Sequence, residues 1–170
     1  MSNIINSCKV RHLEYKISSK PLVCYKIFKI KDNTHYGPFT DYSFPLIIPG
    51  MIIEPQIIHN YKYAILKRIF PALYDKYIKS HKYKLLGGIH YNKEHNWWDI
   101  TSGFIHTLPY CPENLKHYCN DWGTYELWEC EIPKNTLYFQ ADCRGSHYEA
   151  NGTYASKQLK IIRCIDTITI

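Results

Sequence analysis

Residues 102–133 read SGFIHTLPYCPENLKHYCNDWGTYELWECEIP, and this stretch decides the fold that we expect. Its last part, 125–132, alternates in the way of an extended strand, whose successive side chains point to opposite faces. The face expected to meet the core holds Glu126, Trp128, Cys130 and Ile132. The other face holds Tyr125, Leu127, Glu129 and Glu131. The stretch therefore predicts one central strand with a mostly apolar inner face.

The middle of this stretch predicts a short helix from Pro112 to Cys119. Proline is tolerated in a first helical turn, and the Glu113 carboxylate would lie near the positive end of the helix. Gly123 then separates this unit from the strand. Residues 57–83 predict a second helix, because apolar residues recur there every three or four positions. Pro71 should end or kink that helix.

Other segments predict strands or turns. Leu22–Ile30 is rich in β-branched and aromatic residues, and the runs 85–91, 97–106, 137–140 and 159–170 are also apolar. Prolines between residues 36 and 55 leave room only for short extended pieces. We therefore expect a compact α+β fold, mainly antiparallel sheet with two or three short helices. Residues 1–20 would form an N-terminal arm or edge strand, and residues 21–170 a single α+β domain.

Length and composition fit one globular domain. The chain has 170 residues, of which 45% are hydrophobic, enough to build one sizeable core. Its net charge is +6, with no run of five basic residues. The densest basic stretch, residues 76–84, alternates lysines with Tyr77 and Tyr83. It is either a solvated helix face or a patch that follows phosphates, so weak nucleic-acid binding stays open.

The N-terminal residues contain no apolar core of the kind found in secretion signals, and no apolar window is long enough to span a membrane. Seven cysteines, an odd number, then predict free thiols in a reducing compartment. We expect a location in the host cytoplasm and no membrane partner.

Metal and thiol chemistry have candidate residues but no signature. Cys111, His117, Cys119 and either Cys143 or His147 have the side chains that zinc prefers, but no C-x-x-C pair is present. A thiol nucleophile would need Cys111 or Cys143 beside His106 or His147. We expect free thiols and surface histidines, no metal and no cofactor.

A carboxylate-based catalytic site is the sharper possibility. Glu129 and Glu131 form an E-x-E pair on one strand face, about 6–7 Å apart by the rise per residue. Ser102 and His106 close the preceding apolar run. If the two strands are neighbours, the hydroxyl, imidazole and carboxylates would converge on a nucleotide. Solvent-facing glutamates on an edge strand are the alternative.

Aromatic side chains offer a ligand-binding surface. Trp97 and Trp98, with His90, Tyr91 and His95 nearby, could form a platform that stacks on bases or sugars. Tyr25 and Lys26 of the first strong strand are further candidate ligand contacts. The alternative is that one tryptophan lies in the core and the other is half-buried.

The E-x-E pair and the strand before it loosely resemble the ADP-ribosyltransferase pattern, in which a carboxylate stabilises an oxocarbenium-like sugar. Thr101-Ser102-Gly103 stands where that pattern has Ser-Thr-Ser, and the first strong strand has no arginine.

The order of a Tyr25-Lys26 strand, the run 102–106 and the strand 125–133 also resembles small uncharacterised proteins of large DNA viruses and bacteriophages. These carry a "YK" strand, an "sGfH" element and a "vyeveiP" strand, sometimes beside pentapeptide repeats. Here Ile105 is inserted in the Gly-Phe-His element. The resemblance spans about residues 22–165 and implies an α+β fold and a viral origin, but no activity.

Three hypotheses follow for function. The first is a viral or phage accessory module that binds a macromolecule or a small nucleotide-like ligand. The second is an ADP-ribosyltransferase-like enzyme that uses Ser102, His106, Glu129 and Glu131. The third is a nucleic-acid binder that uses the basic stretch 76–84.

Overall fold

The computed structural model describes residues 8–36, 43–44, 47–55, 89–100, 103–119, 121–142 and 152–170. Of these residues, 55% lie in strands and 4% in helical turns, and the strands form three antiparallel sheets. The predicted α+β class, with two or three short helices, is therefore wrong: the described fold is nearly all β. The predicted helix within 57–83, the basic stretch 76–84 and the first part of the run 85–91 lie outside the described residues.

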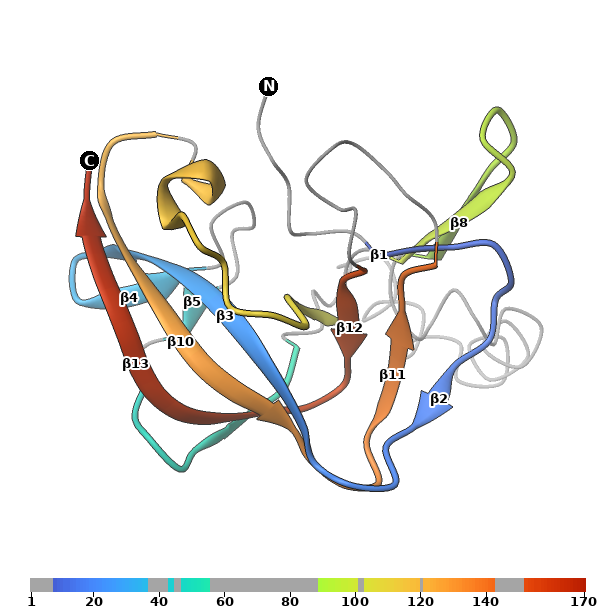
Figure 1. The fold of residues 1–170 in the computed structure, drawn as a ribbon, viewed down its shortest axis with the longest axis horizontal. Coiled ribbons are helices and arrows are strands. Elements are labelled where there is room, and N and C mark those ends of the chain that lie inside the picture. The colour runs from blue at the N-terminus through green and yellow to red at the C-terminus, as the bar shows by residue number, and fades with distance from the viewer. Residues whose placement is uncertain are drawn as a thin grey trace, which may run out of the picture.

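The largest sheet has six strands in the order β5-β4-β3-β10-β13-β6. They are β3 (Leu22–Lys31), β4 (Thr34–Tyr36), β5 (Ser43–Phe44), β6 (Ile52–Ile53), β10 (Thr124–Ile132) and β13 (Leu159–Thr169). Strand β10 pairs with β3 along its whole length and with β13 on its other side. The strand that the alternation at 125–132 predicted is thus the centre of this sheet (Figure 1).

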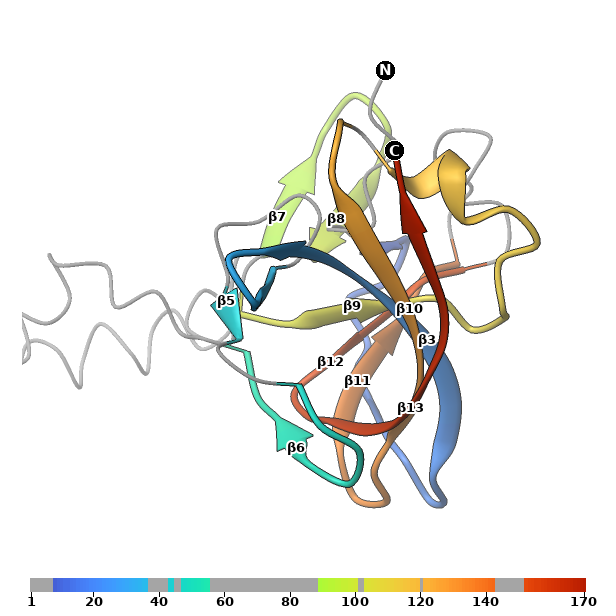
Figure 2. The same ribbon diagram turned by 90° about the vertical axis from the view of Figure 1, so that its left-hand side faces the viewer.

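Two smaller sheets complete the fold. One has the order β2-β11-β12-β9, formed by β2 (Lys16–Ile17), β11 (Leu137–Gln140), β12 (Tyr154–Ser156) and β9 (Ile105–Thr107). The other has the order β1-β8-β7, formed by β1 (Cys8–Val10), β8 (Trp97–Ile100) and β7 (Ile89–Asn92). Figure 2 shows β9, β11 and β12 behind the long strands of the largest sheet, with β9 crossing them at a wide angle.

Two cores separate these layers. The first lies between the largest sheet and the four-stranded sheet, and it contains Trp128, Cys130 and Ile132 of β10. This confirms the predicted inner face of that strand. The second core lies between the four-stranded and three-stranded sheets, where Phe139 and Ala155 meet Val10 and Ile100. The four-stranded sheet is therefore the middle layer.

A third cluster covers the outer face of the largest sheet, where Leu127 and Tyr125 pack under Leu115 and Tyr118. The predicted helix 112–119 is here a single 3₁₀ turn, η2 (Leu115–Tyr118). Both Leu115 and Tyr118 are buried, and a separation of three residues places them on the same side of a 3₁₀ turn. The backbone becomes extended at Cys119, so the helix does not continue.

Candidate functional site

The imidazole of His106 is buried on the side of the second core, not at a surface. His106 pairs with Ala155 across β9 and β12, and its Nε2 lies 2.9 Å from the carbonyl oxygen of Ile100. Desolvation, followed by the nearby charge of Lys26, lowers the pKa of His106 to about 3. The ring is therefore neutral at physiological pH and acts as a structural hydrogen-bonding group between two sheets.

Lys26, on β3 of the largest sheet, approaches β9 from its other face. Its ammonium group reaches into the first core and donates a hydrogen bond of 2.9 Å to the carbonyl oxygen of His106. Burial lowers the pKa of Lys26 from 10.5 to about 8. Its strand neighbour Tyr25 faces outward beside Glu129, so the two expected ligand contacts point to opposite faces of the sheet.

Glu129 and Glu131 lie on the outer face of the largest sheet. Arg163 donates two hydrogen bonds to Glu129, of 2.8 and 3.0 Å, and the Lys160 ammonium lies 3.3 Å from Glu131. Two sheets therefore stand between these carboxylates and the His106 imidazole. Ser102 lies outside the described residues. The described geometry does not bring the expected catalytic residues together.

Trp97 and Trp98 also face opposite sides of their strand. Trp98 packs against the second core and lies 5.1 Å from the Tyr91 ring. Trp97 lies on the outer side, stacked at 4.4 Å on His95, with the Lys9 ammonium 5.3 Å from its ring centre. Adjacent residues of a strand cannot form one flat platform, so the two rings do not act together.

Potential metal ligands do not cluster in the described part of the chain. No three His, Cys, Asp or Glu side chains come together there, and Cys143 and His147 lie outside it. Its cysteines are all free, and Cys8, Cys24 and Cys130 are fully buried. Nor is any helix in this part long and apolar enough to cross a membrane.

Sequence reasoning missed the most exposed large hydrophobic residue that the structure describes. Trp122 is 83% exposed, whereas the other exposed large hydrophobic residues reach at most 55%. It stands on the turn 121–123, between η2 and β10, at the end of the largest sheet where the C-terminus also lies (Figure 1). The indole leaves most of its apolar surface in water, so Trp122 contributes little buried area to the stability of the fold.

The turn that carries Trp122 is held on both sides. On the N-terminal side of Trp122, the Asp121 carboxylate accepts hydrogen bonds from the Lys29 ammonium and the Tyr125 hydroxyl, both at 2.5 Å. These bonds lower the pKa of Asp121. After it, Gly123 and Ile170 exchange two backbone hydrogen bonds of 3.2 and 3.0 Å. The indole is therefore presented from a fixed backbone.

Gly123 suits this position for two reasons. Its φ of 154° is accessible mainly to glycine, and an added Cβ would lie 2.9 Å from the Lys29 Cε. A signal for the site was present in the sequence, because Trp122 stands between Asp121 and Gly123 in a turn-forming stretch. A tryptophan in such a stretch has no strand or helix face on which to be buried.

Comparisons with known proteins give no match, either to protein-family models, to curated proteins or to solved structures. The site has to be interpreted from its own geometry.

Proposed function

We propose that this chain is a binding module that recognises another protein, and that the Trp122 indole is the anchor of the interface. The observation that carries the proposal is an 83% exposed tryptophan on a turn that hydrogen bonds fix from both sides. Tryptophan is among the residues most enriched at the energetic centres of protein interfaces.

The energetics favour an anchor of this kind. A tryptophan can bury roughly 150–250 Å² in a partner's pocket, and at about 25 cal/mol/Å² this gives roughly 4–6 kcal/mol before costs. One cost is the ordering of mobile groups on binding. Asp121 and Gly123 are already held in place, so the backbone contributes little to that cost.

Three cations of the largest sheet are paired with carboxylates, which favours a protein partner over a nucleic acid. Lys29, Lys160 and Arg163 each pair with a carboxylate of the same sheet or of the Trp122 turn, at 2.5, 3.3 and 2.8 Å. Binding to nucleic acid depends on cations that are free to neutralise phosphates. The separation of His106 from Glu129 and Glu131 likewise supports binding over chemistry on a nucleotide.

The neighbouring strand β13 favours contact through side chains over strand addition. It shifts register against β10 at two places, and Asp166 Oδ1 accepts a 2.8 Å hydrogen bond from the Thr167 amide. Bulges and occupied edge amides are the means by which edges avoid pairing with other strands. The Trp122 indole on the adjoining turn, by contrast, stays open to a partner.

A displayed library of random 12-residue peptides tests the proposal, because it presents many candidate partner surfaces at once. We expect selection on the intact chain to enrich peptides that lose at least 30-fold in affinity for Trp122→Ala, which corresponds to about 2 kcal/mol. Tyr91→Ala removes an exposed aromatic residue elsewhere and should leave the affinity unchanged.

Two outcomes would contradict the proposal. One is enriched peptides that bind Trp122→Ala as tightly as the unmodified chain. The other is an absence of peptide binding, together with salt-sensitive binding of a single-stranded oligonucleotide. A viral origin and the reducing cytoplasm of a host cell remain our expectation for the setting in which the partner is met.

A further inference from the structure

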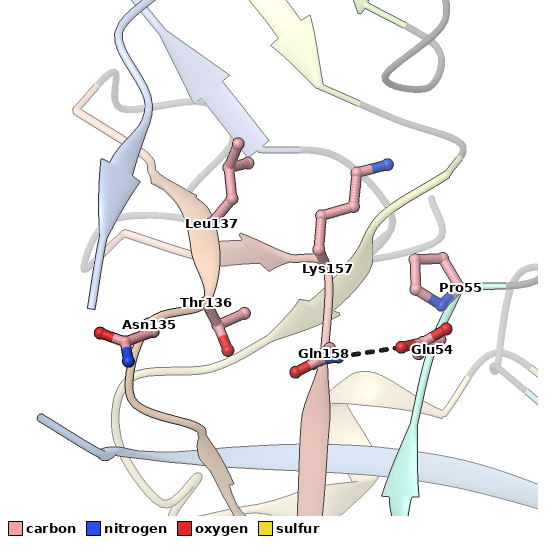
Figure 3. Close-up of a pocket in the computed structure, with 7 residues that line it drawn as sticks. All are labelled: Glu54, Pro55, Asn135, Thr136, Leu137, Lys157 and Gln158. Carbon is pink, nitrogen blue, oxygen red and sulfur yellow. Dashed lines mark hydrogen bonds between the residues drawn. The ribbon is translucent and has the colours of Figure 1, made fainter. Parts of the chain in front are cut away.

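A pocket of about 330 Å³ lies away from the Trp122 turn, at the opposite end of β10. Three segments meet there: the turn after β10, the turn between β12 and β13, and the residues after β6 (Figure 3). Its lining residues are Glu54, Pro55, Asn135, Thr136, Leu137, Lys157 and Gln158. The volume is at the lower end of small-molecule sites, which span about 300–1,000 Å³.

The walls of the pocket are fixed before any ligand enters. Ser18 holds the turn after β10: its hydroxyl accepts a 2.9 Å hydrogen bond from the Thr136 amide, and its carbonyl oxygen accepts one of 2.7 Å from the Asn135 amide. The Lys157 amide donates to the Leu137 carbonyl oxygen at 3.0 Å, which joins the second turn to the first. Binding would therefore cost little in ordering the site.

Several polar groups in the pocket keep unused hydrogen-bonding capacity. Gln158 Nε2 donates to Glu54 Oε1 at 2.9 Å, which leaves the side-chain amide oxygen of Gln158 and the second Glu54 oxygen (Figure 3). Within the described chain no hydrogen bond forms to the Asn135 side chain. Thr136, which is 4% exposed, has a buried hydroxyl oxygen without any partner among the described residues. A buried hydroxyl of this kind costs stability unless something else satisfies it.

The charge of the pocket excludes anions. The Glu54 carboxylate is the only charged group that faces it among the lining residues, because the Lys157 ammonium points away (Figure 3). That ammonium donates to the Gly103 carbonyl oxygen at 2.7 Å and lies 4.1 Å from the centre of the Phe104 ring. Among the residues that line the pocket, no cation is thus placed to bind a phosphate or carboxylate.

We infer that this pocket binds a small neutral polyhydroxylated ligand, a single sugar residue. Sugar hydroxyls both donate and accept, which matches the Gln158 side-chain amide and the Glu54 carboxylate. Leu137 and Pro55 offer apolar surface to the C–H groups of a sugar ring. The inference is independent of the Trp122 anchor, since none of these residues lies on that turn.

Titration of ¹⁵N-labelled protein with the methyl glycosides of glucose, galactose and mannose, and with N-acetylglucosamine, tests the inference by NMR. At least one sugar should give saturable shifts of the Asn135, Thr136, Lys157 and Gln158 amides in the millimolar range. Gln158→Met should weaken that affinity at least tenfold. Gln140→Met makes the same change at an exposed position outside the pocket and should not affect it.

Each other outcome overturns the inference. These are the absence of saturable shifts at the four amides with every sugar, a larger response there to inorganic phosphate or AMP, or unchanged affinity in Gln158→Met. Thermal melts establish that both variants are folded. If Gln158→Met is not folded, Glu54→Gln replaces it, and the same tenfold loss is expected.

Discussion

Replacement of Lys26 by methionine tests how deeply the centre of the largest sheet is buried. Lys26 is the only lysine whose side chain spans the first core in the described part of the chain, and its one hydrogen bond goes to the His106 carbonyl oxygen at 2.9 Å. Burial lowers its pKa from 10.5 in the unfolded chain to about 8. Between these two values the unfolded chain binds more protons than the folded one, so stability rises with pH.

The size of this effect follows from the shift. The lowered pKa of Lys26 corresponds to about 3 kcal/mol of destabilisation at pH 7, of which about 1 kcal/mol remains at pH 10. Lys26→Met removes this dependence. The stability of Lys26→Met relative to the unmodified chain should therefore fall by about 2 kcal/mol between pH 7 and pH 10.

Urea denaturation at a series of pH values measures the difference directly. The buried thiols of Cys24 and Cys130, whose pKa values burial raises, also make the free energy of unfolding depend on pH. They are present in both proteins, so subtracting one free energy of unfolding from the other removes their contribution. Lys134→Met, at an exposed position, is the control and should show no such trend. A constant difference between Lys26→Met and the unmodified chain from pH 7 to pH 10 would refute the assigned burial of Lys26.

Three further changes test the pocket wall and the Trp122 turn. Thr136→Val removes a buried hydroxyl that has no partner among the described residues and should raise the free energy of unfolding by about 1 kcal/mol, measured by urea denaturation; a loss of stability would show that the hydroxyl is satisfied. Ser18→Ala leaves the buried Thr136 amide without its acceptor and should cost about 2 kcal/mol, whereas Ser19→Ala, at an exposed position, should cost less than about 0.5 kcal/mol. Asp121→Asn weakens the bonds to Lys29 and Tyr125 and should reduce the affinity of Trp122-dependent peptides by about three- to tenfold in a fluorescence titration; full affinity would mean that the rigidity of the turn is irrelevant.

Local pattern was sufficient for the long strands. The β-branched run of Leu22–Ile30 and the alternation of residues 125–132 predicted β3 and β10, and the run 159–170 corresponds to β13. These strands pair along most of their length, so local preference and tertiary structure agree. The inner position of Glu126 also follows from the alternation, and its carboxylate meets His35 and the Trp128 indole there at 2.8 Å.

The predicted α+β class was wrong partly because the segment 112–119, predicted as a helix, forms only one helical turn. Pro112 and Glu113 are typical of helix beginnings, but burial of Leu115 and Tyr118 needs only a single 3₁₀ turn. The separation of His106 from Glu129 has another reason. His106 and Glu129 belong to different sheets, and which sheet receives a strand depends on long-range pairing that a local pattern does not contain.

Fluorine NMR of the chain labelled with 5-fluorotryptophan tests the Trp122 anchor most directly. Four signals are expected, one for each tryptophan, and single substitutions assign them. On addition of a selected peptide, the Trp122 signal should shift strongly and follow the binding curve, while the signal of the buried Trp128 stays in place. A bound peptide that leaves the Trp122 signal unmoved would contradict the account.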